Sequence, residues 1–150
     1  MSQSLTQLYL HIVFSTKNHM PFINSSVRKE LYSYIGGVLN TIECQPVKIG
    51  GTDDHIHILC QLSKKITVIK LLEEIKKSSS KWIKTKGNEF SEFSWQDGYG
   101  AFTVSPSGVE NVKLYIGNQE DHHAHEKFRE EYLELLKTNN VEYDEKYLWN

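Results

Sequence analysis

The sequence contains few cysteines and no long apolar run, and both absences restrict what the protein can be. Two cysteines among 150 residues are too few for a disulfide framework, so Cys44 and Cys60 are expected to be buried free thiols. No apolar run approaches the roughly 20 residues that cross a bilayer, and residues 1–6 show no charged-then-apolar signal region. We therefore expect a cytoplasmic protein without a membrane segment.

The chain also lacks internal repeats, low-complexity linkers and a large net charge. Its 39% hydrophobic and 24% charged residues are typical of one ordinary domain, which we assign to residues 1–150. A net charge of −2 argues against a protein coated with basic residues. The charge is nevertheless uneven, because residues 64–86 hold eight lysines and two glutamates, whereas acids dominate residues 120–145. The basic segment is compatible with a bound phosphate backbone or with a solvated helix face.

Alternating and helical hydrophobic patterns follow one another along the chain. The expected elements are a strand at 8–15, a helix from 25 to about 40, strands at 46–49 and from 55, a helix after 63, a strand at 101–104, and helices from about 109 and about 126. Ser25 and Ser26 are the expected N-cap residues of the first helix. The apolar stripe of the second helix is expected to include Ile66, Ile69, Leu72 and Ile75.

This order of elements predicts an α+β protein with a ferredoxin-like (split βαβ) antiparallel sheet. In that topology the first and third strands are central, and both helices between strands cover one face of the sheet. The third strand begins at His55. We therefore expect the opposite face to be open and available for function.

Two histidines separated by one residue stand at the start of the third strand. Because side chains alternate along a strand, His55 and His57 should share one face, while Ile56 and Ile58 point into the core with Cys60. Neutral imidazole is the commonest protein ligand for metals. Two strand histidines can also simply face solvent or bind neighbouring groups, so a metal site requires a third ligand and a reacting group.

Tyr115 and Gln119 are candidates for these roles because residues four apart share one face of a helix. Gly117 between them allows close approach to a neighbouring element. If this helix crosses the open face, the amide oxygen of Gln119 could complete a metal site while Tyr115 points at the metal's substrate. Tyrosine and glutamine are common on helices, so the pair alone leaves a structural role open.

Three segments resemble, in the same order, the single-tyrosine HUH transposases of bacterial insertion sequences, including transposases associated with extragenic palindromes. They are DHIHIL at 54–59, WQDGYGAFTVS at 95–105 and YIGNQEDHH at 115–123. The first strand and residues 141–149 also look similar, so the resemblance covers nearly the whole chain as a single HUH domain. It implies that His55 and His57 are metal ligands, Gln119 is the third ligand and Tyr115 is the nucleophile on an extra C-terminal catalytic helix. Gly117 and Asn118 depart from the family pattern, which affects the packing around the tyrosine.

The resemblance implies that Tyr115 attacks a phosphodiester of single-stranded DNA and forms a 5′-phosphotyrosine, with Mg²⁺ or Mn²⁺ polarising the phosphate. It also implies a homodimer that recognises DNA hairpins near the element ends. Lysines and hydroxyls contact phosphates without reading sequence. Our candidates for hairpin contacts are Lys76, Lys77, Ser80, Lys81 and Lys84.

Two other classes of function remain compatible with the residues. A zinc-dependent hydrolase could use His55, His57 and one of His122, His123 or His125. We expect the group at 122–125 to be mainly solvent-exposed at a helix end. A non-cleaving module could instead bind single-stranded nucleic acid by stacking bases on Tyr9 or His11.

Overall fold

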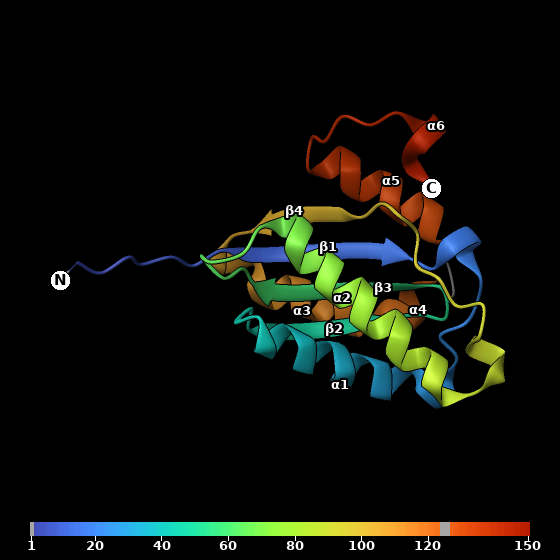
Figure 1. The fold of residues 1–150 in the computed structure, drawn as a ribbon. Coiled ribbons are helices and arrows are strands. Elements are labelled where there is room, and N and C mark those ends of the chain that lie inside the picture. Colours follow the sequence, from blue (N-terminus) through green and yellow to red (C-terminus); the bar gives the residue numbers. More distant parts are fainter. Residues whose placement is uncertain (1, 124–126) are drawn as a thin grey trace.

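Four antiparallel strands form one sheet in the order β2-β3-β1-β4, with helices on both faces (Figure 1). The computed structural model describes residues 2–123 and 127–150. The strands are β1 Tyr9–Ser15, β2 Pro46–Gly51, β3 His55–Gln61 and β4 Gly100–Val104. The helices are α1 Ser25–Thr41, α2 Val68–Ile83, α3 Val109–Gly117, α4 Gln119–His123, α5 Phe128–Thr138 and α6 Glu145–Leu148. Short 3₁₀ turns occur at Lys17–His19, Lys84–Lys86, Asn88–Phe90 and Pro106–Gly108.

Central strands β1 and β3, with α1 and α2 on one face, confirm the predicted ferredoxin-like arrangement. The buried side of β3 carries Ile56, Ile58 and Cys60, as the alternation predicts. Both cysteines are buried free thiols. None of the described helices is both long and apolar enough to span a membrane.

The first helix begins one residue earlier than its predicted cap. Asn24 is the N-cap, and its side chain accepts a hydrogen bond of 3.0 Å from the backbone nitrogen of Ser26. Ser25 and Ser26 lie inside the first turn, so their assignment as caps was wrong. The buried side of α1 is made by Val27, Leu31, Ile35 and Leu39.

The second helix buries a stripe that differs from the predicted one at two positions, because Ile66 precedes the helix, which begins at Val68, and Ile69 is exposed. Leu71, Leu72 and Ile75 are buried, whereas Ile69 is 69% exposed, so its assignment to the core was wrong. Three residues turn a helix by about 300°, so each i, i+3 step shifts the side-chain direction by about 60°. Two such steps separate Ile69 from Ile75 by about 120°, which directs Ile69 toward solvent.

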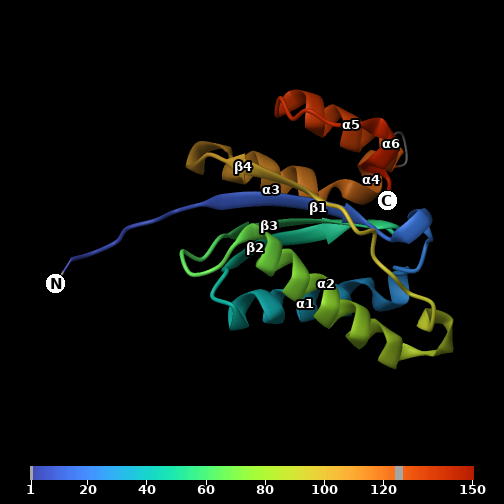
Figure 2. The same ribbon diagram turned by 45° about the horizontal axis from the view of Figure 1, so that its top comes forward.

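The sheet face that was expected to be open is covered. Helix α3 packs across β2 and β3, and α5 buries Phe128, Tyr132 and Leu136 against Val13 of β1 and Phe102 of β4. Figure 2 shows α3, α4 and α5 on one side of the sheet and α1 and α2 on the other. The expectation of an open face was wrong because the chain after β4 folds back over it.

Candidate active site

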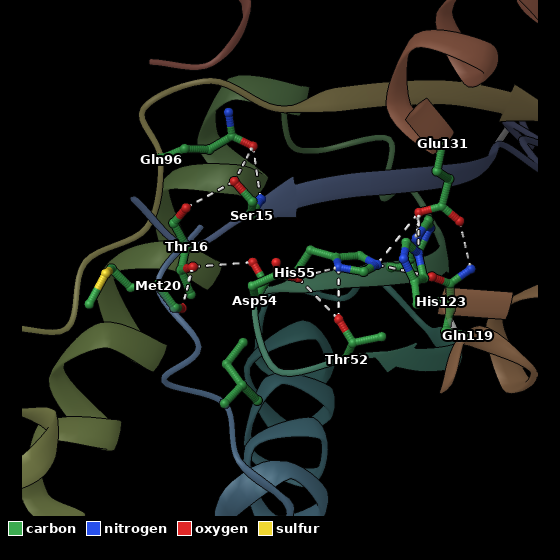
Figure 3. Close-up of polar contacts among 12 residues, drawn as sticks. Ser15, Thr16, Met20, Thr52, Asp54, His55, Gln96, Gln119, His123 and Glu131 are labelled. Atoms are coloured by element: carbon green, nitrogen blue, oxygen red, sulfur yellow. Dashed lines mark hydrogen bonds and ion pairs between the residues drawn. The ribbon is translucent and has the colours of Figure 1, made fainter. Parts of the chain in front are cut away.

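The two histidines of β3 are fully buried. Figure 3 shows His55 directed toward Gln119, His123 and Glu131 of the C-terminal helices. Nδ1 of His55 lies 2.8 Å from Oδ1 of Asp54 and 2.9 Å from Oγ1 of Thr52. A carboxylate bound to one ring nitrogen fixes the orientation of the imidazole. The other nitrogen, Nε2, therefore points toward Gln119 of α4 and Glu131 of α5.

His57 is oriented in a similar way by a third histidine, His11 of β1. Nδ1 of His57 lies 2.8 Å from Nε2 of His11, and the two rings stack. Burial lowers the pKa of His57 to about 4 and the pKa of His11 to about 3, which outweighs the opposite effect of the Glu131 carboxylate. Both rings are thus neutral near pH 7, the form that binds metals. Because His11 is buried, the alternative in which bases stack on this ring is not supported.

The structure places Gln119 and Tyr115 on two helices instead of one. Helix α3 ends at Gly117, Asn118 is its C-cap, and Gln119 begins α4. Oε1 of Gln119 nevertheless lies 3.0 Å from Nε2 of His55. The ring of Tyr115 packs edge-on against His57, with a centroid distance of 5.6 Å. The four residues predicted from the sequence therefore meet in one cluster.

Glu131 of α5 joins this cluster and was missed in the sequence. One carboxylate oxygen, Oε1, lies 3.1 Å from Nε2 of His57 and 3.5 Å from Nε2 of His55. The other oxygen, Oε2, accepts hydrogen bonds from the Tyr115 hydroxyl and, at 2.9 Å, from Nε2 of Gln119. The sequence does contain a signal for this role, because Glu131 falls on the buried stripe of α5 with Phe128, Tyr132 and Leu136. A carboxylate in such a stripe requires buried partners.

His123 also contacts Glu131, so the expectation that it faces solvent was wrong. Its Nε2 lies 2.9 Å from Oε1 of Glu131. Burial alone would raise the pKa of Glu131, but hydrogen bonds from His123 and His57 lower it well below its usual range. The carboxylate is therefore ionised at neutral pH. The side chain of His122 and residue His125 lie outside the described part of the chain.

One known protein family matches most of the chain. The family model for IS200-like transposases matches residues 4–119. The chain belongs to the IS200-like transposase family. No curated protein sequence matches the chain significantly.

Two solved structures share the fold with this IS200-like transposase. One is a protein from Deinococcus radiodurans R1 that is provisionally assigned as a transposase; it has a TM-score of 0.62 and 18% identity, over 79% of this chain and 98% of that chain. The other is a REP-associated tyrosine transposase bound to a REP hairpin, with a TM-score of 0.59 and 14% identity, over 82% of this chain and 74% of that chain. At these identities the likeness supports the fold alone.

The donor atoms of this IS200-like transposase fit a divalent cation. Ligand atoms of His55, His57 and Glu131 lie within 4.8 Å of one another, and Gln119 adds an amide oxygen. Adjacent ligands of an octahedral ion with bonds of about 2.1 Å are about 3.0 Å apart, close to the 3.0–3.5 Å separations from Nε2 of His55. Carboxylate and amide oxygens suit Mg²⁺ and Mn²⁺, while imidazole nitrogens favour Mn²⁺ over Mg²⁺.

Four of the five predicted hairpin-binding residues lie on α2, across the sheet from this cluster, and the fifth, Lys84, is the C-cap of that helix. Lys76 differs from the rest, because its Nζ donates hydrogen bonds of 2.8–3.0 Å to the carbonyl oxygens of Gln96, Asp97 and Gly98. These hydrogen bonds link the segment before β4 to α2. Lys77, Lys81 and Lys84 are exposed and Ser80 is half-buried; we call these four residues the α2 basic face.

Proposed function

We propose that this chain is a transposase that cleaves and rejoins single-stranded DNA, with Tyr115 as the nucleophile. The observation that carries this proposal is the meeting of the Tyr115 hydroxyl with Glu131, which itself contacts His57 and Gln119. A nucleophile and the candidate metal ligands thus share one carboxylate. This is the arrangement that a phenol needs, because it is a weak nucleophile unless a neighbouring group or metal activates it.

In the proposed reaction the phenol oxygen of Tyr115 attacks a phosphorus atom of the strand. A tyrosine–phosphate bond forms, the bond from phosphorus to the 3′ oxygen breaks, and that oxygen leaves with a proton from water as a 3′-hydroxyl. Glu131 accepts a hydrogen bond from the phenol before the attack and would accept its proton. Attack by a 3′-hydroxyl on the phosphotyrosine reverses these steps and rejoins DNA.

His55, His57 and Glu131, with Gln119, would hold the Mg²⁺ or Mn²⁺ ion of this reaction. When bound, the ion supplies Lewis-acid polarisation of the phosphate. The protein residues do the remaining work: Asp54 and Thr52 orient His55, while α3 and α5 bring Tyr115 and Glu131 together.

We further propose that the DNA substrate forms hairpins and that the α2 basic face contacts their phosphates. Support comes from the related REP-associated transposase, which is bound to a REP hairpin, and from the exposed lysines of α2. The protein would act in the cytoplasm as a homodimer, so that one tyrosine is available for each element end.

The test is a covalent-adduct assay with end-labelled single-stranded DNA and Mn²⁺. Wild type should give labelled DNA that stays with the denatured protein until protease is added. Tyr115→Phe should abolish this species and leave the protein folded, with a somewhat lower melting temperature because Glu131 loses one hydrogen bond. Tyr147→Phe, at an exposed tyrosine, is the matched control and should retain the adduct. An undiminished adduct in Tyr115→Phe would assign the attack to another residue.

A further inference from the structure

An open basic groove adjoins the candidate active site beside Gln119. It has a volume of about 540 Å³ and lies between α1, the edge strand β2 and the junction of α3 with α4. Its lining includes Arg28, Lys29, Tyr32, Lys48, Gln119 and Glu120. Gln119 is the point where this groove reaches the metal-ligand cluster, since its amide oxygen contacts His55.

The groove carries an excess of positive charge. Arg28, Lys29 and Lys48 line it together with one carboxylate, Glu120, which is paired with Arg28. Among the described residues no carboxylate forms an ion pair with Lys29 or Lys48, and both side chains are exposed. Their ammonium groups are therefore available to an anionic ligand.

The other described cavities at the cluster have a different character. The cavity beside Tyr115 and His11 has no charged residue in its lining. The small cavity under α5 contains Glu131 and Glu134 and no cation. The cavity beside Asp54 balances two acids with Lys127, Arg129 and neighbouring histidines. Among these four cavities of the described residues, the groove beside Gln119 is the one whose lining contains both lysines without a carboxylate partner and a candidate metal ligand.

Two glycines, Gly50 and Gly117, allow close contacts at the groove, between β2 and α3 and between Lys48 and the end of α3. A Cβ atom at Gly50 would lie 2.6 Å from the carbonyl oxygen of Ile116, so the absence of a side chain lets α3 rest on β2. A Cβ atom at Gly117 would lie 3.5 Å from Cε of Lys48. The Lys48 chain thus passes over the turn that separates Tyr115 from Gln119.

A buried hydroxyl in the groove has no partner within the described protein. Oη of Tyr32 is buried and forms no hydrogen bond with any described residue, and burial raises the pKa of this phenol. A buried polar group without a partner destabilises the folded protein. An oxygen of a bound ligand would supply the missing hydrogen-bond acceptor.

We infer that this groove binds phosphates of the single DNA strand next to the bond that Tyr115 attacks. The inference rests on the proposed function and specifies where the strand enters the site. Lys29 and Lys48 would contact successive backbone phosphates, and Tyr32 would donate a hydrogen bond to one phosphate oxygen. Such contacts fix the register of a strand without reading its sequence. They also position the scissile phosphate at Gln119, which increases the rate of an attack that depends on orientation.

The test compares two double variants with the same change of charge. Lys29→Gln/Lys48→Gln removes the two free groove lysines, and Lys65→Gln/Lys137→Gln removes two lysines outside both the groove and the α2 basic face. The probe is a short labelled oligodeoxythymidylate, which forms no hairpin. The groove variant should bind about tenfold more weakly at low salt, and the slope of log affinity against log salt should fall by about 1.4, or 0.7 for each lost phosphate contact. Affinities and slopes equal to those of the control variant would overturn the inference.

Tyr32→Phe separates a ligand-binding role from a structural one. Removal of an unpartnered buried hydroxyl should leave the melting temperature of the DNA-free protein unchanged or raise it, while affinity for the oligonucleotide falls several-fold. A lower melting temperature with unchanged affinity would assign the hydroxyl to the fold and contradict its role in the groove. The covalent-adduct assay keeps the two proposals distinct. If wild type forms no adduct, the proposed function is wrong. If wild type forms the adduct but the groove variants bind the oligonucleotide as tightly as their controls, only the inference about the groove is wrong.

Discussion

The two faces of the sheet use the same strands for opposite purposes. Under α1 and α2 the sheet presents apolar side chains such as Ile12, Ile56 and Ile58. Under α3, α4 and α5 the same strands present His11, His55 and His57. Successive side chains of a strand point to opposite faces of the sheet, so one strand can contribute to both surfaces. One face holds the fold together and the other holds reactive groups in place.

The faces also differ in how precisely they are specified. The free energy gained by burying apolar groups is non-directional and roughly proportional to the buried area. The apolar face therefore requires only side chains of suitable volume and shape. On the polar face each ring nitrogen of His55 and His57 has a partner at 2.8–3.1 Å. A buried polar network is stable only when its members are satisfied, and it then fixes a unique arrangement. Substitutions on the two faces should therefore differ in their effects on stability, on the response to Mn²⁺ and on pH dependence.

The largest expected effect on stability is at the apolar face. Ile58→Ala should lower the free energy of unfolding by about 2–5 kcal/mol, because it leaves a cavity beneath α1 and α2. Mn²⁺ should still raise the melting temperature of this variant as much as that of wild type, since ligand-induced stabilisation depends only on ion concentration and affinity. Thermal melts with and without Mn²⁺ measure both quantities.

His57→Ala is the matched change on the opposite face of β3. It should abolish the Mn²⁺-induced rise in melting temperature, because a candidate metal ligand is removed. It should also destabilise the metal-free protein, since Glu131 loses a buried partner. If Ile58→Ala lost the Mn²⁺ response and His57→Ala kept it, the assignment of roles to the two faces would be wrong.

The next effect in size is the dependence of stability on pH, which should come from the polar face. His11 and His57 have pKa values of about 3 and about 4 in the folded protein, below the value of about 6.5 in an unfolded chain. Between these values the unfolded state binds more protons, so stability falls as the pH falls below about 6.5. Each histidine contributes at most about 1.4 kcal/mol per pH unit.

Urea unfolding at several pH values, with a chelator present, measures this dependence. Glu131 acts in the same direction at lower pH, because its pKa is lowered in the folded state. His11→Asn removes one of the two groups and should make the loss of stability between pH 6.5 and 4.5 shallower. A pH dependence that is the same in His11→Asn and wild type would show that these buried rings do not determine it.

The sequence predicted the apolar face well because its information is local. Alternation in β3 identified Ile56 and Ile58 as core, and the order of elements identified the sheet topology. The exposed Ile69 was misassigned because apolar residues occur on both sides of a helix stripe, and only packing decides which of them is buried.

The polar face was only partly predictable because it depends on segments that are distant in sequence. His55 and His57 were singled out by their spacing, and Tyr115 and Gln119 by the resemblance to a family. Glu131 was missed because its partners come from β3, α3 and α4, and nothing local shows that α5 returns over the sheet. The same return of the chain covers the face that was expected to be open.

The smallest expected effect comes from a change at the edge of the apolar face. Ile69 is exposed, so Ile69→Lys should change the free energy of unfolding by no more than about 0.5 kcal/mol. Leu72 of the same helix is buried, and Leu72→Lys should destabilise the protein by several kcal/mol, because a charge without a partner would enter the core. Urea unfolding of the two variants compares the same new side chain at positions three residues apart. Similar destabilisation at both positions would mean that Ile69 belongs to the buried surface after all, whether through α2 or through a contact between two copies of the chain.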